Sequence, residues 1–246
     1  MLSELSGLLG VRQNDVVSFV GAGGKTTSML TLAAELAPRG TLLVTTTTRM
    51  WNLREHPARL GSAASLLSQL PPAGRINVFA SGAELSGERE KLTGIAPQDV
   101  DLLAGSGCFD WILVEADGAA GRLFKAPASH EPVVASSTTM LVMVFAADIL
   151  GKPLTDQHVH RLDHVVRCAR QPEGSRITAG TVLGVLSHPE GGRKRKPPRA
   201  KAVVLCTRTD LVDQAILADF RQTFRGHEFD RVVLWSNVRR EGELVT

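Results

Sequence analysis

The stretch Val16-Val17-Ser18-Phe19-Val20-Gly21-Ala22-Gly23-Gly24-Lys25-Thr26-Thr27 decides the fold of this chain of 246 residues. Residues 16–20 are apolar and mostly β-branched, which predicts a short buried strand that ends at the glycines. Residues 27–37 carry apolar side chains at helical spacing until Pro38 and Gly40, which predicts a helix. A strand, a glycine loop and a helix in this order are typical of a loop that binds anions in a parallel α/β protein.

The rest of the chain alternates apolar strands with helical patterns. We expect further strands at residues 41–47, 76–80, 111–117, 140–146, 202–206 and 231–235, and helices at residues 58–70, 97–104, 157–169, 178–186 and 213–224. This alternation predicts an α/β fold with a mostly parallel, doubly wound sheet and helices on both faces. We expect one nucleotide-binding domain over residues 1–246, with insertions at residues 49–105 and 189–200.

Composition excludes several classes of protein. The longest apolar stretch, residues 140–147, is too short to span a bilayer, and Cys108, Cys168 and Cys206 form no C-x-x-C pair. We therefore expect a cytoplasmic protein with no membrane partner, no disulfide framework and no structural zinc site. The basic run at residues 193–196 lies among glycines and prolines, and aromatic residues make up 4% of the chain. These features favour a solvated or phosphate-facing loop and predict no nucleic-acid partner.

The glycine loop carries the strongest functional signal. Adjacent phosphates need close backbone amides, and glycine permits that approach, so we expect a nucleoside triphosphate to bind Gly21, Ala22, Gly23, Gly24, Lys25, Thr26 and Thr27. Lys25 is expected to reach the terminal phosphates, and the Thr26 hydroxyl to bind magnesium. The loop is the short form G-x-x-G-K-T, similar to the loop of the Mur ligases, because Phe19 stands where the longer motif has glycine. A plain turn with an exposed lysine is the alternative.

Two carboxylates lie at the carboxyl end of the predicted strand at residues 111–117. Glu115 and Asp117 alternate along that strand, so we expect them to face the same way at its carboxyl end. We assign magnesium to Asp117 together with Thr26, and a water-orienting role to Glu115, so that the predicted catalytic residues are Lys25, Glu115 and Asp117. Thr46, within the four threonines at residues 45–48, is a candidate contact to an acceptor substrate, although β-propensity alone would also favour threonine there.

The segment Thr207-Arg208-Thr209-Asp210 resembles the [NT]-K-x-D motif with which GTPases bind guanine, with arginine in place of lysine. We assign base binding to Thr207, Arg208 and Asp210, with Ser236-Asn237 as the remaining loop on the base side. The alternative is that Asp210 caps the helix that follows it. The expected cofactor is Mg²⁺ with ATP or GTP.

Several segments together resemble the YqeC family, which comprises accessory proteins of selenium-dependent molybdenum hydroxylases. They are residues 20–27, 44–48, 113–118, 125–132, 151–154 and 159–161. The resemblance implies a P-loop nucleotide-binding fold and a role in maturing a selenium- or molybdenum-containing cofactor. It also supports acceptor-binding roles for Lys125, His130, Glu131, His160 and Arg161.

The function we expect is magnesium-dependent binding of GTP or ATP, with hydrolysis or with phosphoryl or nucleotidyl transfer. The acceptor is water or a molybdopterin- or selenium-containing intermediate, and the partner is a client hydroxylase. Two alternatives stay open: a nucleotide-gated delivery or assembly factor for a client metalloenzyme, and a non-enzymatic cofactor-binding protein with a relic loop.

Overall fold

A nine-stranded sheet forms the centre of the protein, in the order β14-β13-β12-β10-β1-β8-β2-β5-β4. The computed structural model describes residues 4–245, and residues 1–3 and 246 lie outside this description. All neighbouring strands are parallel except the β13–β14 pair. The predicted mostly parallel α/β fold is therefore confirmed. The strands are β1 (Asp15–Gly21), β2 (Leu42–Thr46), β4 (Arg59–Leu60), β5 (Ile76–Ala80), β8 (Trp111–Glu115), β10 (Met140–Ala146), β12 (Lys201–Thr207), β13 (Arg231–Ser236) and β14 (Glu241–Leu244).

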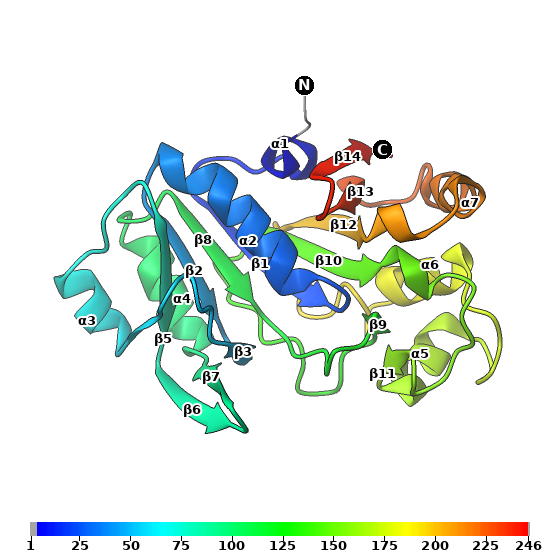
Figure 1. Ribbon diagram of the computed structural model, residues 1–246, viewed down its shortest axis with the longest axis horizontal. Helices are drawn as coiled ribbons and strands as arrows, with labels where there is room; N and C mark the ends of the chain where they lie inside the picture. The colour runs from blue at the N-terminus through cyan, green and yellow to red at the C-terminus, as the bar shows by residue number, and fades with distance from the viewer. Residues whose placement is uncertain (1–3, 246) are drawn as a thin grey trace.

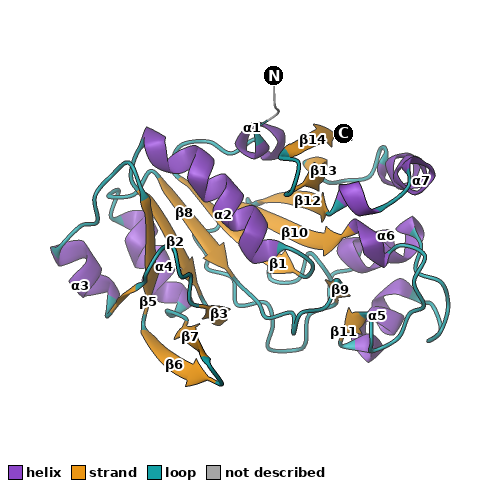
Figure 2. Cartoon of the chain, viewed as in Figure 1, coloured by secondary structure: helices purple, strands orange, loops and turns teal. Residues whose placement is uncertain are grey.

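Helices cover both faces of this sheet (Figures 1 and 2). One face packs on α1 (Leu5–Leu9) and α2 (Lys25–Leu36), and the other on α3 (Ala63–Ser68), α4 (Pro97–Gly105), α5 (Leu162–Ala169), α6 (Ala179–Ser187) and α7 (Gln214–Phe224). Within residues 4–245 there are also 3₁₀ turns at η1 (Ala37–Arg39), η2 (Ala147–Ile149) and η3 (Thr209–Leu211). Successive side chains of β1 alternate between the two cores, with Val17 and Phe19 on the α2 side and Val16 and Val20 on the other. Burial on both faces explains why the central strands are apolar throughout.

Strand β1 lies where the strand order reverses. On one side of it come β8, β2 and β5, and on the other β10, β12 and β13. In doubly wound sheets the ligand crevice opens beyond the carboxyl ends of the strands at this point. The glycine loop leaves β1 at this position and leads directly into α2.

The segment at residues 49–105 is divided between two sheets. It supplies β4 and β5 to the main sheet, and it also forms a separate antiparallel sheet of β3 (Arg49–Trp51), β7 (Arg89–Thr93) and β6 (Gly82–Ser86). This small sheet projects at the lower left of Figure 1. Gly94 connects it to the body so closely that a Cβ there would lie 2.5 Å from backbone atoms of Thr47 and Thr48.

The prediction of a helix over residues 157–169 is wrong at its start, because α5 begins only at Leu162. Val159–His160 instead form β11, which pairs in parallel with β9 (Phe124–Lys125). The sequence pattern is local, whereas this pairing depends on a segment far away in the chain. The pairing brings the residues around His160 next to Lys125.

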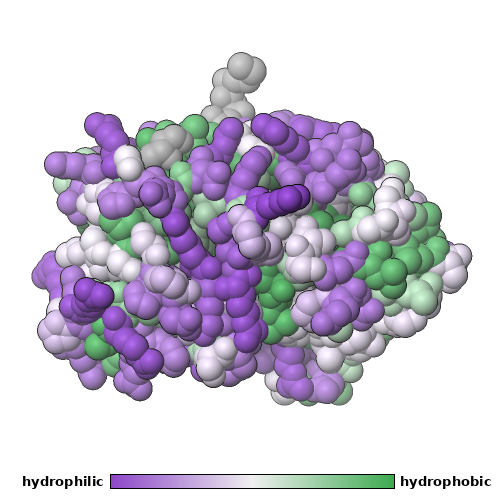
Figure 3. Space-filling view, turned by 180° about the vertical axis from the view of Figure 1, so that it is seen from behind, coloured by the Kyte–Doolittle hydropathy of each residue, from purple (hydrophilic) through white to green (hydrophobic). Residues whose placement is uncertain are grey.

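The rear surface has an apolar end. Figure 3 shows hydrophobic side chains gathered over the end of the molecule that carries α3 and α4, where Leu70 and Leu102 are about half exposed. Among residues 4–245, no helix combines the length and the apolar character needed to cross a membrane.

Candidate functional site

The glycine loop lies directly against β10, and two of its glycines are required by space as well as by backbone angle. Gly21 has a φ of 98° and Gly23 a φ of 74°, in the region that favours glycine. A Cβ on Gly21 would lie 2.2 Å from the carbonyl oxygen of Val144, and one on Gly23 would lie 2.6 Å from the carbonyl oxygen of Leu123. Any larger residue at either position would push the loop away from the sheet.

The loop presents a run of free backbone donors. Gly21 N–H donates to Asp117 and Ala22 N–H to the Val144 carbonyl oxygen, whereas the five N–H groups of residues 23–27 donate to no other group within residues 4–245. Gly24 is the residue before α2, so these donors surround the amino terminus of the helix. Unpaired N–H groups and the helix dipole together make this position attractive to an anion.

Lys25 turns its ammonium group back beneath the loop. Its Nζ lies 2.6 Å from the carbonyl oxygen of Gly21 and 2.9 Å from Oδ1 of Asp117, and its side chain is 4% exposed. Burial alone would lower the pKa of Lys25, but the carboxylates of Asp117 and Glu115 raise it above its ordinary value. Lys25 is therefore an ammonium ion held inside the protein by carboxylates.

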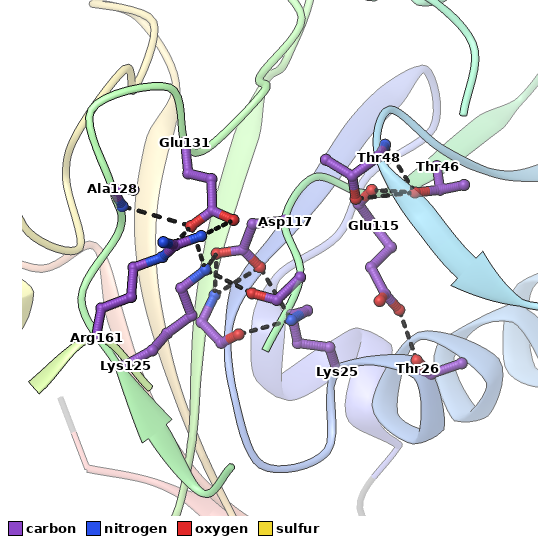
Figure 4. A network of polar contacts seen from close by, with 12 residues as sticks. Lys25, Thr26, Thr46, Thr48, Glu115, Asp117, Lys125, Ala128, Glu131 and Arg161 are labelled. Carbon is purple, nitrogen blue, oxygen red and sulfur yellow. Dashed lines mark hydrogen bonds and ion pairs between the residues drawn. The ribbon is translucent and has the colours of Figure 1, made fainter. Parts of the chain in front are cut away.

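Asp117 begins a chain of alternating buried charges (Figure 4). Its Oδ2 lies 3.0 Å from Nζ of Lys125, which lies 2.8 Å from Oε2 of Glu131. Arg161 donates to both oxygens of Glu131, from Nε at 3.1 Å and from Nη2 at 3.0 Å. Burial alone would raise the pKa of Glu131, but hydrogen bonds from Lys125 and Arg161 lower it to about 2. We call Lys25, Asp117, Lys125, Glu131 and Arg161 the ion-pair chain.

Glu115 reaches a different partner from Asp117. Its Oε2 accepts a hydrogen bond from the hydroxyl of Thr26 at 2.5 Å, and its backbone oxygen accepts one from the Thr46 hydroxyl at 2.8 Å. Burial raises the pKa of Glu115, although the neighbouring Lys25 offsets part of that rise. The structure therefore brings Thr26 together with Glu115, while Asp117 is bound by two ammonium groups.

The predicted base-binding residues follow β12. The Thr207 hydroxyl is buried and donates to the carbonyl oxygens of Gly23 and, at 3.2 Å, of Phe145, so Thr207 fixes the glycine loop. Arg208 pairs with Asp148 at 3.1 Å. Asp210 accepts a hydrogen bond of 2.7 Å from the Ser236 hydroxyl, which joins the two segments expected on the base side. Binding of a base at these residues stays a prediction.

The predicted acceptor residues divide into two groups. Lys125, Glu131 and Arg161 meet in the ion-pair chain, and burial, reinforced by these two cations, lowers the pKa of the adjacent His160. His130, in contrast, is an exposed residue outside this chain of ion pairs.

The basic run at residues 193–196 makes hydrogen bonds within the protein that the sequence did not indicate. Lys194 donates to the carbonyl oxygen of Ala128 at 3.0 Å, and Arg195 donates to that of His130 at 3.0 Å. These two partners are backbone carbonyl groups, which leave no signature in a sequence. The run fixes the segment at residues 128–132, on which His130 and Glu131 lie.

The fold and the site together define an α/β protein with a glycine loop at the centre of its sheet, supported by a buried chain of ion pairs. The chain matches the model of the YqeC protein family over residues 17–163, which include every member of the ion-pair chain. It is 30% identical over 229 residues to "Uncharacterized protein YqeC" from Escherichia coli (strain K12), with coverage of 89% of this chain and 86% of that protein. The chain therefore belongs to the YqeC family, which confirms the resemblance seen in its segments.

Proposed function

We propose that this protein binds a nucleoside triphosphate, ATP or GTP, with the phosphates on residues 23–27. The observation that carries the proposal is the run of five unpaired backbone N–H groups at the amino terminus of α2. An anion at this position would accept several hydrogen bonds and would interact favourably with the helix dipole. Lys25, at the first position of the helix, supplies the positive charge nearest to that anion.

Magnesium fits the pair formed by Thr26 and Glu115. A hydroxyl and a carboxylate at 2.5 Å are oxygen donors of the kind that Mg²⁺ prefers. Among the described residues no three His, Cys, Asp or Glu side chains are grouped to hold a metal ion, so nucleotide phosphates and water would supply the other ligands. We thus assign Glu115 to the ion in place of Asp117, whose oxygens are bound by Lys25 and Lys125. The ion would neutralise charge on the terminal phosphates.

The glycine loop, Lys25 and Asp117 would have different roles in the transfer of a phosphoryl group. The free amides hold the phosphates, and Lys25 exchanges Asp117 for the terminal phosphate, where its charge stabilises the transferred group. Asp117 keeps Lys125 and the Gly21 N–H as partners. In phosphoryl transfer, an oxygen of water or of an acceptor bonds to the terminal phosphorus, and the bond to the bridging oxygen breaks. The nucleoside diphosphate leaves, and the attacking oxygen passes its proton to solvent. Nucleotidyl transfer is the other form of this proposal: the acceptor oxygen bonds to the α-phosphorus, pyrophosphate leaves, and the acceptor's proton again passes to solvent.

The resemblance to accessory proteins of molybdenum hydroxylases supports a proposal for the biological role of this reaction. We propose that it serves the maturation of a selenium- or molybdenum-containing cofactor, with a molybdopterin- or selenium-containing intermediate as acceptor.

A second candidate function is a nucleotide-gated delivery or assembly factor. It is favoured by the ion-pair chain, because Lys25 is linked through Asp117 and Lys125 to the segment at residues 128–132. Movement of Lys25 toward a phosphate would change the charge balance along this chain. A client hydroxylase that co-purifies only with the triphosphate form supports this function, and equal co-purification with diphosphate or without nucleotide contradicts it.

The test of nucleotide binding is a thermal-shift panel of ATP, GTP and their diphosphates, each with and without Mg²⁺. Ligand at 100 times its Kd stabilises the folded state by about 2.7 kcal/mol. We expect the wild-type protein and Lys201→Met to be stabilised and Lys25→Met not to be. Lys201 is the matched control because it lies at the amino end of β12, whereas the glycine loop follows the carboxyl end of the parallel strand β1. No shift of wild type with any nucleotide at millimolar concentration overturns the proposal.

A further inference from the structure

We propose that the outward face of the small sheet docks an extended, acidic segment of a partner protein. This face carries the side chains of Arg49, Trp51, Glu84, Arg89 and Lys91, and we call it the Trp51 face. It lies outside the glycine-loop site, and the proposal does not depend on nucleotide binding. Figure 1 shows β6 and β7 projecting beyond the main sheet, so the Trp51 face is accessible to a partner.

The register of the small sheet separates a buried face from an outward one. Met50 pairs with Leu92, and both side chains are buried in the core on the α2 side. Trp51 pairs with Lys91, one position further along β3 and one position back along β7, so these side chains lie on the opposite face. Glu84 of β6 pairs with Lys91 and shares that face. The Trp51 face is therefore turned away from the core.

Trp51 leaves an indole ring partly in water. It is 38% exposed, whereas the other two tryptophans of the chain, Trp111 and Trp235, are 7% and 1% exposed. Tryptophan combines a large apolar ring with an N–H donor, and it is enriched among the residues that dominate binding at protein interfaces. Trp51 is thus the anchor of the proposed docking surface.

Two cations lie over Trp51 without a carboxylate partner. The guanidinium carbon of Arg89 is 4.5 Å from the ring centroid, and Nζ of Lys91 is 4.3 Å from it. Within residues 4–245 neither side chain forms an ion pair or a hydrogen bond, whereas Arg49 pairs with Glu84 at 3.0 Å. A cation over a ring keeps N–H donors for an anion. The Trp51 face therefore combines an apolar ring with two positive charges that are not neutralised.

The spacing of these cations defines the partner. Arg89 and Lys91 are two residues apart on β7, so carboxylates two residues apart on an extended segment match their spacing. The side chain between two such carboxylates points the other way, which leaves room for apolar residues in alternate positions. An extended segment in which acidic and apolar residues alternate fits the face best.

The same sheet disfavours a nucleic acid. Its strands and the turn between β6 and β7 contain three basic residues, but also Glu84, Glu88 and Glu90. Single-stranded nucleic acid binds along a continuous positive groove, and these carboxylates would interrupt it. A protein segment that places one carboxylate on each free cation avoids them, because Glu84 is paired and Glu90 lies on the opposite face.

The Trp51 face is ordered before a partner binds. At the base of the small sheet, the N–H and the hydroxyl of Ser81 both donate to the carbonyl oxygen of Thr93 at 3.1 Å. The pair of Arg49 and Glu84 links the outer strands β3 and β6 across β7. Attraction to the indole ring also restricts the two free cations. Such a surface loses less side-chain entropy on binding than a mobile one.

The experiment titrates an acidic peptide with the full chain in the absence of nucleotide. The probe is a fluorescein-labelled octapeptide of alternating glutamate and valine, and fluorescence anisotropy at low ionic strength measures its affinity. We expect saturable binding that Trp51→Ala weakens about tenfold. Arg89→Gln and Lys91→Gln should each weaken it about threefold. Arg225→Gln, which removes an exposed cation at the end of α7, is the control and should bind as wild type does.

The controls separate the Trp51 face from general attraction between charges. A melting temperature for each variant confirms that it is folded. No saturable binding, or unchanged affinity in both Trp51→Ala and the double variant Arg89→Gln/Lys91→Gln, overturns the inference. Equal binding of a peptide with glutamine in place of glutamate also overturns it, because the carboxylates would then contribute nothing. An octamer of thymidylate that binds more tightly than the peptide, and that Trp51→Ala weakens, would assign the face to single-stranded nucleic acid instead.

Discussion

Nζ of Lys25 lies 2.9 Å from Oδ1 of Asp117, and both side chains are almost completely buried. A triphosphate on residues 23–27 would compete with Asp117 for this lysine. Because Asp117 also binds Lys125, it would keep one cation if Lys25 moved to a phosphate. The ion-pair chain thus allows one of its members to change partner while the other charges stay paired.

Asp117→Asn tests this competition. The amide can still accept the Gly21 N–H, but two ammonium groups lose their shared carboxylate, so we expect the free energy of unfolding to fall by roughly 3 kcal/mol. Phosphates would then replace the missing negative charge, so stabilisation by magnesium nucleotide should be larger than in wild type. Urea unfolding with and without nucleotide measures both effects. Asp219→Asn, on the exposed side of α7, should change neither. A nucleotide effect no larger than that of wild type would show that Asp117 does not compete for Lys25.

Thr26→Val tests the magnesium pair. The variant keeps the backbone N–H of residue 26 but loses the hydroxyl that donates to Glu115. We expect nucleotide to bind still, while the increase in affinity caused by Mg²⁺ falls about tenfold. Titration of nucleotide at several magnesium concentrations measures this. Thr31→Val, whose hydroxyl donates to the Thr27 carbonyl oxygen on the same helix, should retain the full magnesium effect. Loss of the effect in both variants would point to damage to α2.

Gly23→Ala tests the fit of the loop against β10. The new methyl group would lie 2.6 Å from both the Leu123 carbonyl oxygen and the Ala146 Cβ, at a positive φ. We expect a loss of roughly 2–4 kcal/mol in unfolding free energy, from strain and overpacking together. Gly87→Ala is matched in φ but meets nothing within 4 Å, so only the backbone cost of about 1 kcal/mol should remain. Equal losses in the two variants would mean that the loop moves without cost.

Glu131 should make stability depend on pH in acid. Its pKa is lowered from 4.5 to about 2 in the folded protein, so its stabilising contribution is complete above pH 4.5 and disappears as the pH falls toward 2. Glu131→Gln should lower the unfolding free energy at pH 7 by about 2 kcal/mol, and the difference from wild type should shrink over this range. Glu84→Gln breaks an exposed pair with Arg49 and should cost less than 1 kcal/mol. A difference for Glu131→Gln that does not change with pH would contradict the assigned pKa.

Much of the main sheet could be predicted from the sequence, because its central strands are buried on both faces and their apolar runs are plain. The strands at residues 76–80 and 140–146 have the predicted bounds. The short strands β9 and β11 were missed, since each has two residues and forms only by pairing with the other. β14 was missed as well, because its burial pattern is mostly exposed and carries no apolar signal.

The candidate site was predictable in its residue types and less so in its pairings. Strand periodicity placed Glu115 and Asp117 together at a strand end, yet it could not show that Thr26 meets Glu115 or that Asp117 meets Lys125. Beyond the end of β8 the chain leaves the regular strand, so alternation no longer decides which partner a side chain reaches. The donors of Arg195 go to backbone oxygens, for which no residue type is diagnostic.

The ladder between β9 and β11 also orders the assembly of the site during synthesis. β10 lies between these two strands in the chain, so a ribosome must complete the sheet's central strands before Val159–His160 can pair with Phe124–Lys125. The glycine loop and α2 emerge much earlier, together with β1 and β2. A nascent chain therefore carries the residues of the glycine loop well before Arg161 is synthesised to pair with Glu131. The residues of the two halves of the site emerge from the ribosome at separate times.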